Sequence, residues 1–480
     1  CNREQVEVPH LCYHPQQRAD GNCRACVVEI QGERVLAPSC RRCPEDGMVV
    51  TTDSERVQRA QSGVLNLLDS TVSGRRYALD DEFRKWKSAF GDCTESAARH
   101  ADTHRDDSHP AIDFNADACI LCTRCVRACR EVQVNNVIGM AHRGGRSRIV
   151  FDLDDPLGDS RCVGCGECVQ ACPTGALANK NGVDLVQPDR VVDSVCPYCG
   201  VGCLLSYSVK DNRIIKVEGR DGPANRSRLC VKGRYGFDYI HHPERLTQPL
   251  LRRPGIPKGM NEYFDPADPY RMFQAVSWEE ALDYAADSLL ALRENQGFEA
   301  LAGFGSAKGS NEEAYLFQKL VRTVFGNNNV DHCTRLCHAS SVAALLEGVG
   351  SGAVSNQVED VRHADLILVI GSNTTANHPV AATFIKQARR AGKTLVVIDP
   401  RRIELAREAD LFLQFRPDSD VALLNALLHT VIDENLIDEA FIRERSRDFE
   451  QIRLNVADFS PEQMAPICGI DAEELSLIHI

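Results

Sequence analysis

Residues 364–400 read ADLILVIGSNTTANHPVAATFIKQARRAGKTLVVIDP, and this stretch decides the fold class of the second half of the chain. Two continuous apolar runs, 364–373 and 393–400, have the composition of strands buried on both faces of a sheet. The segment between them, 378–392, has apolar residues at helical spacing. This strand–helix–strand unit predicts a parallel, doubly wound sheet, in which ligands bind at the carboxyl ends of the strands.

The alternation of helices and strands extends towards the N-terminus from this unit. The sequence predicts helices over 278–295 and 311–326, with Asn311 as the cap of the second. A short apolar run over 300–306 predicts a strand between them. We therefore expect an α/β domain over residues 251–480.

The two strand ends of the first unit carry residues suited to nucleotide binding. Gly371 and Asn373 follow one strand, and Asp399 and Arg401 follow the other. Glycine lets the backbone approach a phosphate, and an acidic side chain at a strand end can accept a hydrogen bond from a ribose. These residues predict a nucleotide-binding edge, with ordinary strand-to-helix turns as the alternative interpretation.

The chain has 480 residues, 22 cysteines and a formal net charge of −13. In a chain with ample apolar residues for a core, cysteines at short regular spacings favour metal binding over disulfides. Thiolate ligands indicate a reducing compartment, which predicts a cytoplasmic protein. The acidic charge argues against a nucleic acid partner, and no apolar run approaches the roughly 20 residues of a membrane span.

Four quartets of cysteines have spacings typical of iron–sulfur clusters. The first quartet predicts a [2Fe–2S] centre. Its members are Cys12, Cys23, Cys26 and Cys40. The run VVEI after Cys26 predicts a short strand. A zinc knot is the alternative, and Cys43 could replace Cys40 as a ligand.

The next group is an internal repeat of the spacing C-x2-C-x2-C-x3-C, which is the pattern of two-cluster bacterial ferredoxins. In this pattern three close thiolates bind one [4Fe–4S] cluster, and the fourth ligand comes from the other motif. One predicted ligand set is therefore Cys119, Cys122, Cys125 and Cys172. The other is Cys162, Cys165, Cys168 and Cys129.

The fourth quartet has the spacing C-x2-C-x3-C-x26-C. This spacing suits a further [4Fe–4S] cluster that is bound by three thiolates of one loop and by a fourth thiolate farther along the chain. Its members are Cys196, Cys199, Cys203 and Cys230. Strand-like runs LLSYSV and RIIKVEG between the loop and Cys230 predict a hairpin. A zinc ribbon would more naturally show two separated Cys-x-x-Cys pairs.

These motifs resemble known families. The first quartet is similar to the N-terminal ferredoxin-like domain of the large electron-transfer subunit of NADH dehydrogenases, and of related hydrogenases and formate dehydrogenases. The segment with the fourth quartet, which ends in Cys-Val-Lys-Gly-Arg, resembles the first domain of the molybdopterin bis(guanine dinucleotide) oxidoreductases. That resemblance implies that Lys232 lies between cluster and pterin as an electron relay. The alternative for Lys232 is a solvated surface lysine.

Residues 329–341, NVDHCTRLCHASS, resemble the segment of formate dehydrogenases in which a Cys or selenocysteine precedes His. The resemblance implies that Cys337 ligates molybdenum or tungsten and that His338 is the neighbouring base. A soft thiolate suits such a metal, and an imidazole can take a proton near neutral pH. The same resemblance, extended by GFGSAKGSNEEAYLFQK and NHPVAATFIKQA, implies cofactor-binding residues Gly305, Lys308, Asn311, Gly371, Asn373, His378, Asp399, Arg401 and Asp420.

Five remaining cysteines have no predicted ligand role. We expect Cys333 to be structural, and Cys1, Cys43, Cys93 and Cys468 stay unassigned. The larger relatives carry His-x3-Cys-x2-Cys-x5-Cys between the first two cysteine groups, whereas this chain has only Cys93 and scattered histidines there. We therefore predict no cluster in that stretch.

The expected fold is a multidomain α+β and α/β arrangement. Its regions are a [2Fe–2S] ferredoxin-like domain at 1–69, a charged, partly flexible connector at 70–112, a two-cluster ferredoxin domain at 113–190, a [4Fe–4S] domain at 191–250 and an α/β catalytic domain at 251–480.

The resemblance implies the alpha subunit of a cysteine-type, NAD-linked formate dehydrogenase, C-terminally truncated, so that the active-site Arg lies beyond the chain end. Such an enzyme oxidises formate reversibly to carbon dioxide at a bis(molybdopterin guanine dinucleotide) centre. Electrons would pass through one [2Fe–2S] and three [4Fe–4S] clusters to a flavin- and iron–sulfur-containing NAD-reducing subunit. The alternatives are a non-catalytic electron conduit of an NADH dehydrogenase or hydrogenase complex, a nitrate reductase-like molybdoenzyme, and a zinc-rich scaffold.

Overall fold

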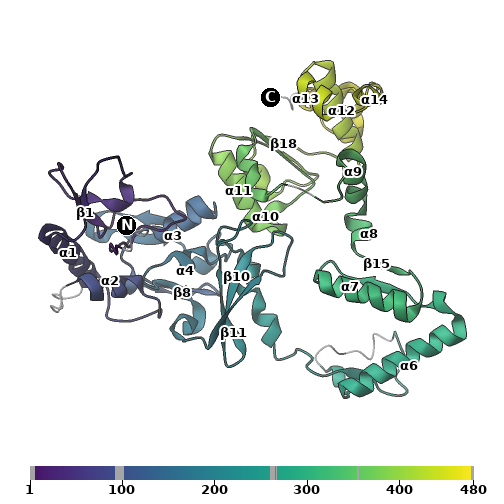
Figure 1. The fold of residues 1–480 in the computed structure, drawn as a ribbon, viewed down its shortest axis with the longest axis horizontal. Helices are drawn as coiled ribbons and strands as arrows, with labels where there is room; N and C mark the ends of the chain where they lie inside the picture. Colours follow the sequence, from purple (N-terminus) through teal and green to yellow (C-terminus); the bar gives the residue numbers. More distant parts are fainter. Residues whose placement is uncertain (1–5, 92–101, 260–264, 266–267, 354–355, 477–480) are drawn as a thin grey trace. The chain divides into compact units, whose positions relative to one another are not determined.

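The computed structural model describes residues 6–91, 102–259, 265, 268–353 and 356–476. The chain divides into two compact units (Figure 1). Unit 1 comprises Cys1–Tyr235 and Gln357–Ile480, and unit 2 comprises Gly236–Asn356. Unit 1 is therefore formed from two distant parts of the chain, and unit 2 is the segment between them.

Unit 1 opens with a three-stranded antiparallel sheet in the order β2-β1-β3. Its strands are β1 (Val27–Ile30), β2 (Ala37–Pro38) and β3 (Val50–Thr51), so the strand predicted for VVEI is confirmed. Helix α1 (Glu55–Thr71) begins after Ser54, whose hydroxyl accepts a hydrogen bond from the backbone N–H of Val57. Buried Gln61 anchors α1 to the sheet by donating to the carbonyl of Val27 at 3.0 Å.

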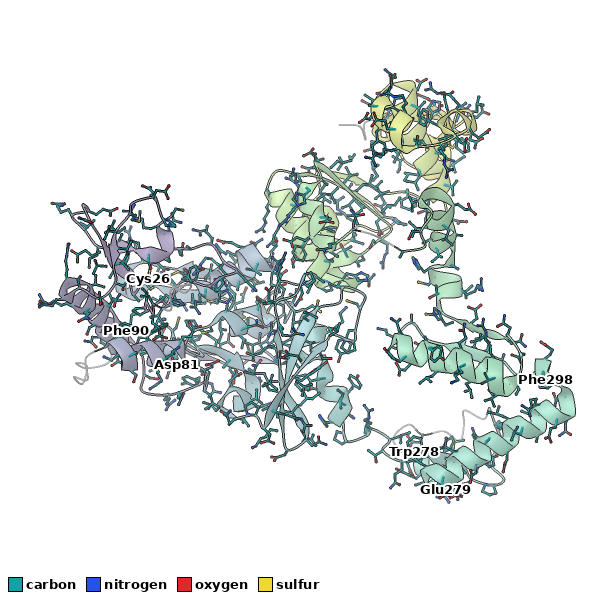
Figure 2. The ribbon with its side chains drawn as sticks, viewed as in Figure 1. Cys26, Asp81, Phe90, Trp278, Glu279 and Phe298 are labelled. Carbon is teal, nitrogen blue, oxygen red and sulfur yellow. The ribbon has the colours of Figure 1, made fainter. Side chains whose placement is uncertain are left out.

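The structure differs from the predicted connector over 70–112, because an ordered helix occupies part of it. Helix α2 (Glu82–Phe90) begins after Asp81, and Figure 2 labels the residues at its two ends, Asp81 and Phe90. Phe83 and Trp86 lie three residues apart on one helix face and are buried. This buried pair packs against Leu11, Leu65, Val72, Ile120 and Cys122. Because the rest of the segment is mostly polar, the sequence alone did not reveal the helix.

Residues 92–101, including Cys93, lie outside the described residues.

The next region is built on a small sheet in the order β4-β5-β8 and on a separate hairpin of β6 and β7. Their bounds are β4 (Arg105–Asp106), β5 (Ile112–Asn115), β6 (Ile138–Ala141), β7 (Arg148–Phe151) and β8 (Leu177–Asn179). Short helices carry the cysteine motifs: α3 (Arg124–Arg127), a π-helix at Ala128–Val132 and α4 (Glu167–Ala171). The rings of Phe114 and Phe151 meet edge to face in the core, with centroids 5.5 Å apart.

The third region contains an antiparallel sheet in the order β11-β10-β9. Its elements are β9 (Arg190–Val195), β10 (Leu204–Lys210), β11 (Arg213–Gly219) and helix α5 (Val231–Tyr235). The hairpin predicted between the cysteine loop and Cys230 is confirmed as β10 and β11.

The last part of unit 1 is a parallel sheet in the order β16-β17-β18. Its strands are β16 (Leu366–Ile370), β17 (Thr394–Ile398) and β18 (Leu411–Leu413). Helix α11 (Pro379–Arg390) makes the predicted crossover between β16 and β17, after the short α10 (Thr374–Asn377). The parallel α/β expectation is therefore confirmed. Five helices follow: α12 (Asp420–Asp433), α13 (Glu439–Arg445), α14 (Phe449–Asn455), α15 (Pro461–Cys468) and α16 (Ala472–Ser476).

Unit 2 has an antiparallel pair, β12 (Leu250–Arg252) with β13 (Phe273–Ala275), and a parallel pair, β14 (Gly303–Gly305) with β15 (Val330–His332). Its helices are α6 (Trp278–Gln296), α7 (Asn311–Leu320), α8 (Thr334–Cys337) and α9 (Ala339–Val349). Figure 2 labels Trp278 at the start of α6 and Phe298 just beyond its end.

The predicted cap of α7 is wrong by one residue. Ser310, not Asn311, precedes the helix, and its hydroxyl and the Glu313 carboxylate form a reciprocal capping box. The box outcompetes Asn311 because two N–H groups are satisfied at once. In the described part of the chain, no helix is long and apolar enough to cross a bilayer.

Candidate functional site

The first cysteine quartet surrounds one point beside β1. The backbone N–H of Cys12 points at the sulfur of Cys23, at 3.4 Å. Burial, together with the nearby thiols of Cys26 and Cys12, raises the pKa of the Cys40 thiol to about 12. Cys43 is exposed. Geometry therefore favours Cys40 over Cys43 as the fourth member.

The second quartet lines a small cavity that is otherwise largely apolar. Burial raises the pKa of Cys125, and so do the thiols of Cys122, Cys119 and Cys172. The member from the distant second motif, Cys172, thus lies with the three from the first. This is the grouping that the ferredoxin-type repeat predicts.

The third quartet likewise combines three cysteines of one motif with one cysteine, Cys129, of the other motif. Burial raises the pKa of Cys168, and the thiols of Cys165, Cys162 and Cys129 act in the same direction. Backbone N–H groups are directed at two of these sulfurs, from Val137 to Cys129 at 3.3 Å and from Gly164 to Cys162 at 3.4 Å. Such N–H···S contacts are a means by which proteins tune bound clusters.

The internal repeat extends to the backbone. Leu121 and Thr123 in the first motif have φ of 54° and 63°, and their equivalents Gly164 and Gly166 have φ of 63° and 67°. Left-handed residues at these alternating positions turn the loop around its centre. The two motifs therefore fold as copies of one loop, although only the second uses glycine.

The fourth quartet lies at the end of the β10–β11 hairpin. Burial, together with the thiols of Cys196, Cys199 and Cys230, raises the pKa of Cys203 to about 12. Among the described residues, no three His, Cys, Asp or Glu side chains converge closely enough to hold a single metal ion. Each quartet includes buried cysteines, among them Cys26, Cys125, Cys168 and Cys203.

Lys232 lies between the fourth quartet and the start of the crossover helix. Its Nζ donates to the carbonyl of Ala376 at 3.0 Å, and burial raises the pKa of Cys196 while the charge of Lys232 opposes that rise. A cavity of about 830 Å³ opens beside Lys232, with Cys230, Thr375, Pro379 and Lys386 among its lining residues.

The predicted dinucleotide residues of unit 1 gather at the carboxyl edge of the parallel sheet. Gly371 has φ of 58°, and its N–H donates to the carbonyl of Ile398 on the next strand at 2.9 Å. Buried Asp399 accepts a hydrogen bond from the backbone N–H of exposed Arg401. Asn373 accepts from the hydroxyl of Thr375 at 3.1 Å. This edge brings together four of the predicted residues.

An unpaired polar atom lies at the same edge. The Thr374 hydroxyl is buried and has no hydrogen-bond partner among the described residues, as expected of a site that a polar ligand completes. His378 lies between α10 and α11. Asp420 begins α12 and is exposed.

Unit 2 holds the predicted metal ligand. Cys337 is the last residue of α8, His338 separates α8 from α9, and both are exposed within the unit. A large open cavity lies between β14, β15, α7 and α9. Cys337 and His338 are not among its lining residues, which include Gly305, Glu313, Tyr315, Asp331, His332 and Arg335.

Other predicted residues of this part have simple placements. Lys308 and Asn311 are exposed near the start of α7. Cys333, expected to be structural, is also exposed. Cys468 is fully buried among the C-terminal helices, and Cys1 lies outside the described residues.

Sequence reasoning missed two buried arginines, Arg124 and Arg127, inside the first of the two repeated motifs. It also missed buried Glu167, which Arg234 approaches at 3.5 Å. The sequence did contain a signal for their burial: each of Arg124, Arg127 and Glu167 stands between two closely spaced ligand cysteines, where a side chain seldom reaches solvent.

Four family models match consecutive parts of the chain. They describe a 2Fe-2S iron-sulfur cluster binding domain (1–55), a 4Fe-4S dicluster domain (118–176), a molybdopterin oxidoreductase Fe4S4 domain (189–242) and a molybdopterin oxidoreductase (245–470). The chain carries a molybdopterin oxidoreductase domain that follows iron–sulfur domains. The expected fold class, with ferredoxin domains before a molybdopterin domain, is confirmed.

Curated relatives match along nearly the whole length of this chain. A protein named probable oxidoreductase YjgC from Bacillus subtilis (strain 168) is 34% identical over 99% of this chain and 51% of its own. A protein named putative formate dehydrogenase from Staphylococcus aureus (strain USA300) is 33% identical over 98% of this chain and 50% of its own. Among solved structures, acetylene hydratase from Pelobacter acetylenicus aligns with 59% of this chain and 37% of its own, at 23% identity and a TM-score of 0.48. The chain thus spans about half the length of the curated relatives it matches.

Proposed function

We propose that this chain is the catalytic subunit of a formate dehydrogenase, which converts formate reversibly to carbon dioxide. The observation that carries the proposal is the Cys337–His338 pair at the end of the NVDHCTRLCH segment, within the matched molybdopterin oxidoreductase part. Relatives named putative formate dehydrogenase at 33% identity support it. The cofactor would be a molybdenum or tungsten centre with two molybdopterin guanine dinucleotides.

The residues present fit such a group at two places. The carboxyl edge of the parallel sheet, with Gly371, Asp399 and the unpaired Thr374 hydroxyl, would hold part of one dinucleotide. In unit 2, Gly305 lines the open cavity next to β15. The bound metal–pterin group would supply two-electron redox chemistry at a sulfur-rich centre.

The chain itself would bind the metal through Cys337 and exchange a proton through His338. The Cys337 thiol, exposed at the end of α8, is available as a metal ligand. The imidazole of His338, on the next residue, would act as the base beside the metal ligand. The ion pair of Arg335 with Asp331, at 2.7 Å, holds the turn that presents both side chains.

Electrons would leave through the cysteine quartets. Lys232 lies beside the fourth quartet and donates to the carbonyl of Ala376 near the end of α10, so it would be the first protein contact on the way out. The ferredoxin-like pair and the [2Fe–2S] quartet would follow, towards a flavin-containing, NAD-reducing partner subunit. Four clusters of these types would give about fourteen irons per chain.

The matched pair Cys337→Ala and Cys333→Ala tests the proposal. Both cysteines are exposed and lie one helical turn apart, so the two changes perturb the fold similarly. In the full-length gene product, expressed with molybdate or tungstate, C337A should abolish formate-dependent viologen reduction, whereas C333A should retain it. Iron content should be equal in both.

Turnover in C337A would refute the assignment of Cys337 as metal ligand. A wild-type protein with iron but without molybdenum, tungsten or formate activity would instead support the non-catalytic electron conduit.

A further inference from the structure

Two buried arginines lie beside the second cysteine quartet, and one of them also contacts the first. Arg124 and Arg127 are 2% and 3% exposed. One apolar cluster contains both Cys12 of the first quartet and Cys122 of the second, so the two quartets share a wall. Burying a guanidinium is costly unless its N–H groups are bonded, which makes the partners of these arginines informative.

Arg127 is bonded to the backbone of both quartets. Its Nη2 donates to the carbonyl of Cys12 at 2.5 Å and to that of Cys122 at 3.2 Å. Its Nη1 donates to the carbonyl of Arg18 at 2.6 Å. One rigid guanidinium therefore joins two ligand-bearing residues that are 110 positions apart in the sequence.

The charge of Arg127 is only weakly matched, unlike that of Arg124. Arg124 makes a two-pronged ion pair with Glu82 of α2, at 2.6 and 2.8 Å. The nearest carboxylate to Arg127 is Asp20, at 3.9 Å from Nε. The positive charge of Arg127 therefore faces the two quartets, within a region of low dielectric.

We propose that Arg127 is a positioning residue for electron transfer between the [2Fe–2S] cluster and the neighbouring [4Fe–4S] cluster, an inference that rests on the cluster assignment in the proposed function. In this step one electron leaves the reduced [4Fe–4S] cluster, which is oxidised, and reduces the [2Fe–2S] cluster. No bond forms or breaks, and no proton moves.

Two physical effects follow from the geometry. The planar fork holds the Cys12 and Cys122 carbonyls on one group, which fixes the separation of the clusters and gives a short bonded route between them. A buried positive charge also stabilises the more negative, reduced form of a neighbouring cluster, so Arg127 raises its reduction potential.

The test uses the full chain, purified anaerobically with its clusters and reduced stepwise with dithionite, and it needs no bound pterin. Three variants are compared: Arg127→Met, Arg127→Lys and Arg18→Met. The Arg18 side chain is exposed, and only its carbonyl meets Arg127, so R18M is a matched control that leaves this contact intact. The readouts are the midpoint potential of the [2Fe–2S] electron paramagnetic resonance signal and its spin-relaxation rate, which a nearby reduced cluster increases.

R127M is expected to lower the midpoint potential and to slow the relaxation relative to wild type. R127K, which keeps the charge but loses the planar fork, should retain most of the potential and still slow the relaxation. R18M should match wild type in both. If R127M loses its clusters on purification, R127K decides the outcome by its relaxation rate alone.

Wild-type relaxation in R127K, or wild-type values of both readouts in R127M with clusters intact, would overturn the positioning role. Absence of any [2Fe–2S] signal in the wild-type chain would instead defeat the cluster assignment itself, so the two failures are distinguishable.

Discussion

Single residues decide how the two ferredoxin-type loops differ. Gly166 and Thr123 occupy equivalent left-handed positions, yet only Gly166 has no room for a side chain. A Cβ at Gly166 would collide with Arg234, which donates from Nε to the carbonyl of Cys165 at 2.7 Å. Glycine is therefore required in the second loop by packing as well as by φ.

Gly166→Ala should lower the free energy of unfolding by about 3 kcal/mol, because a left-handed alanine costs about 1–2 kcal/mol and overpacking adds a similar amount. Gly182→Ala is the matched control, with φ of 66° and nothing within 4 Å of its Cβ, and should cost only about 1 kcal/mol. Denaturant titration of both variants measures the difference. Equal losses would mean that the Arg234 contact does not constrain Gly166.

His109 gives the fold a pH dependence near neutrality. Its side chain is buried, and Nδ1 accepts a hydrogen bond from the backbone N–H of Ala111 at 3.1 Å. Burial lowers the pKa of His109 from its ordinary 6.5, and the charge of Lys180 lowers it further. As the pH falls through 6.5, the unfolded chain takes up the proton first, so this contribution to stability is present above 6.5 and is lost as the pH falls towards the folded pKa.

His109→Gln removes this proton uptake. We expect the stability advantage of wild type over H109Q to shrink between about pH 7.5 and about pH 5.5, since an ordinary His titrates within that window. Urea unfolding at the two pH values measures it. An advantage that stays constant would show that His109 does not titrate differently in the folded and unfolded states.

At the scale of elements, Asn225 closes the loop that returns Cys230 to its quartet. The residue is fully buried, and its amide makes four hydrogen bonds to the backbone. Its Oδ1 accepts from the Leu204 N–H, and its Nδ2 donates to the carbonyls of Leu204, Arg220 and Arg228. The amide therefore replaces a strand partner at the end of the β10–β11 hairpin.

Asn225→Ala removes these four hydrogen bonds inside the fold and should cost about 2–3 kcal/mol. We expect the variant to lose iron more readily than wild type, because the Cys230 segment is released. Iron content after gel filtration, together with denaturant unfolding, measures both effects. Lys210→Ala, on the exposed side of the same hairpin, is the control and should resemble wild type; a normal iron content in N225A would contradict the role assigned to the amide.

At the scale of the whole molecule, the two parts of unit 1 contact each other directly, without residues of unit 2. Gln387 of α11 donates to the carbonyl of Glu131 at 2.6 Å, and Arg228 donates to the hydroxyl of Thr383 at 2.8 Å. The Arg226–Glu359 ion pair, at 2.7 Å, adds a surface contact. The parallel sheet region is thus bonded directly to the iron–sulfur regions.

Replacing residues 236–356 by a flexible Gly/Ser linker should therefore leave the iron content of the chain at its wild-type value while removing Cys337. Because unit 1 keeps all sixteen ligand cysteines, iron analysis and the visible absorption of the clusters should be unchanged. Formate-dependent activity should be absent. A large loss of iron on deletion would show that unit 1 does not fold independently.

Periodicity and spacing alone predicted much of this protein. The β16–α11–β17 crossover, the β10–β11 hairpin and helix α6 follow from local apolar patterns, which depend only on neighbouring residues. The cysteine quartets follow from spacing, since ligands on one loop must lie close together. The family models confirm the order of the domains.

Tertiary structure decided what local patterns cannot encode. Helix α2 is hidden in a charged stretch because its two buried aromatic residues matter only against a surface formed by distant segments. The choice of Cys40 over Cys43 depends on which thiol reaches Cys12 and Cys26. The burial of Arg127 between two quartets depends on a contact across more than a hundred residues, which no local sequence signal specifies.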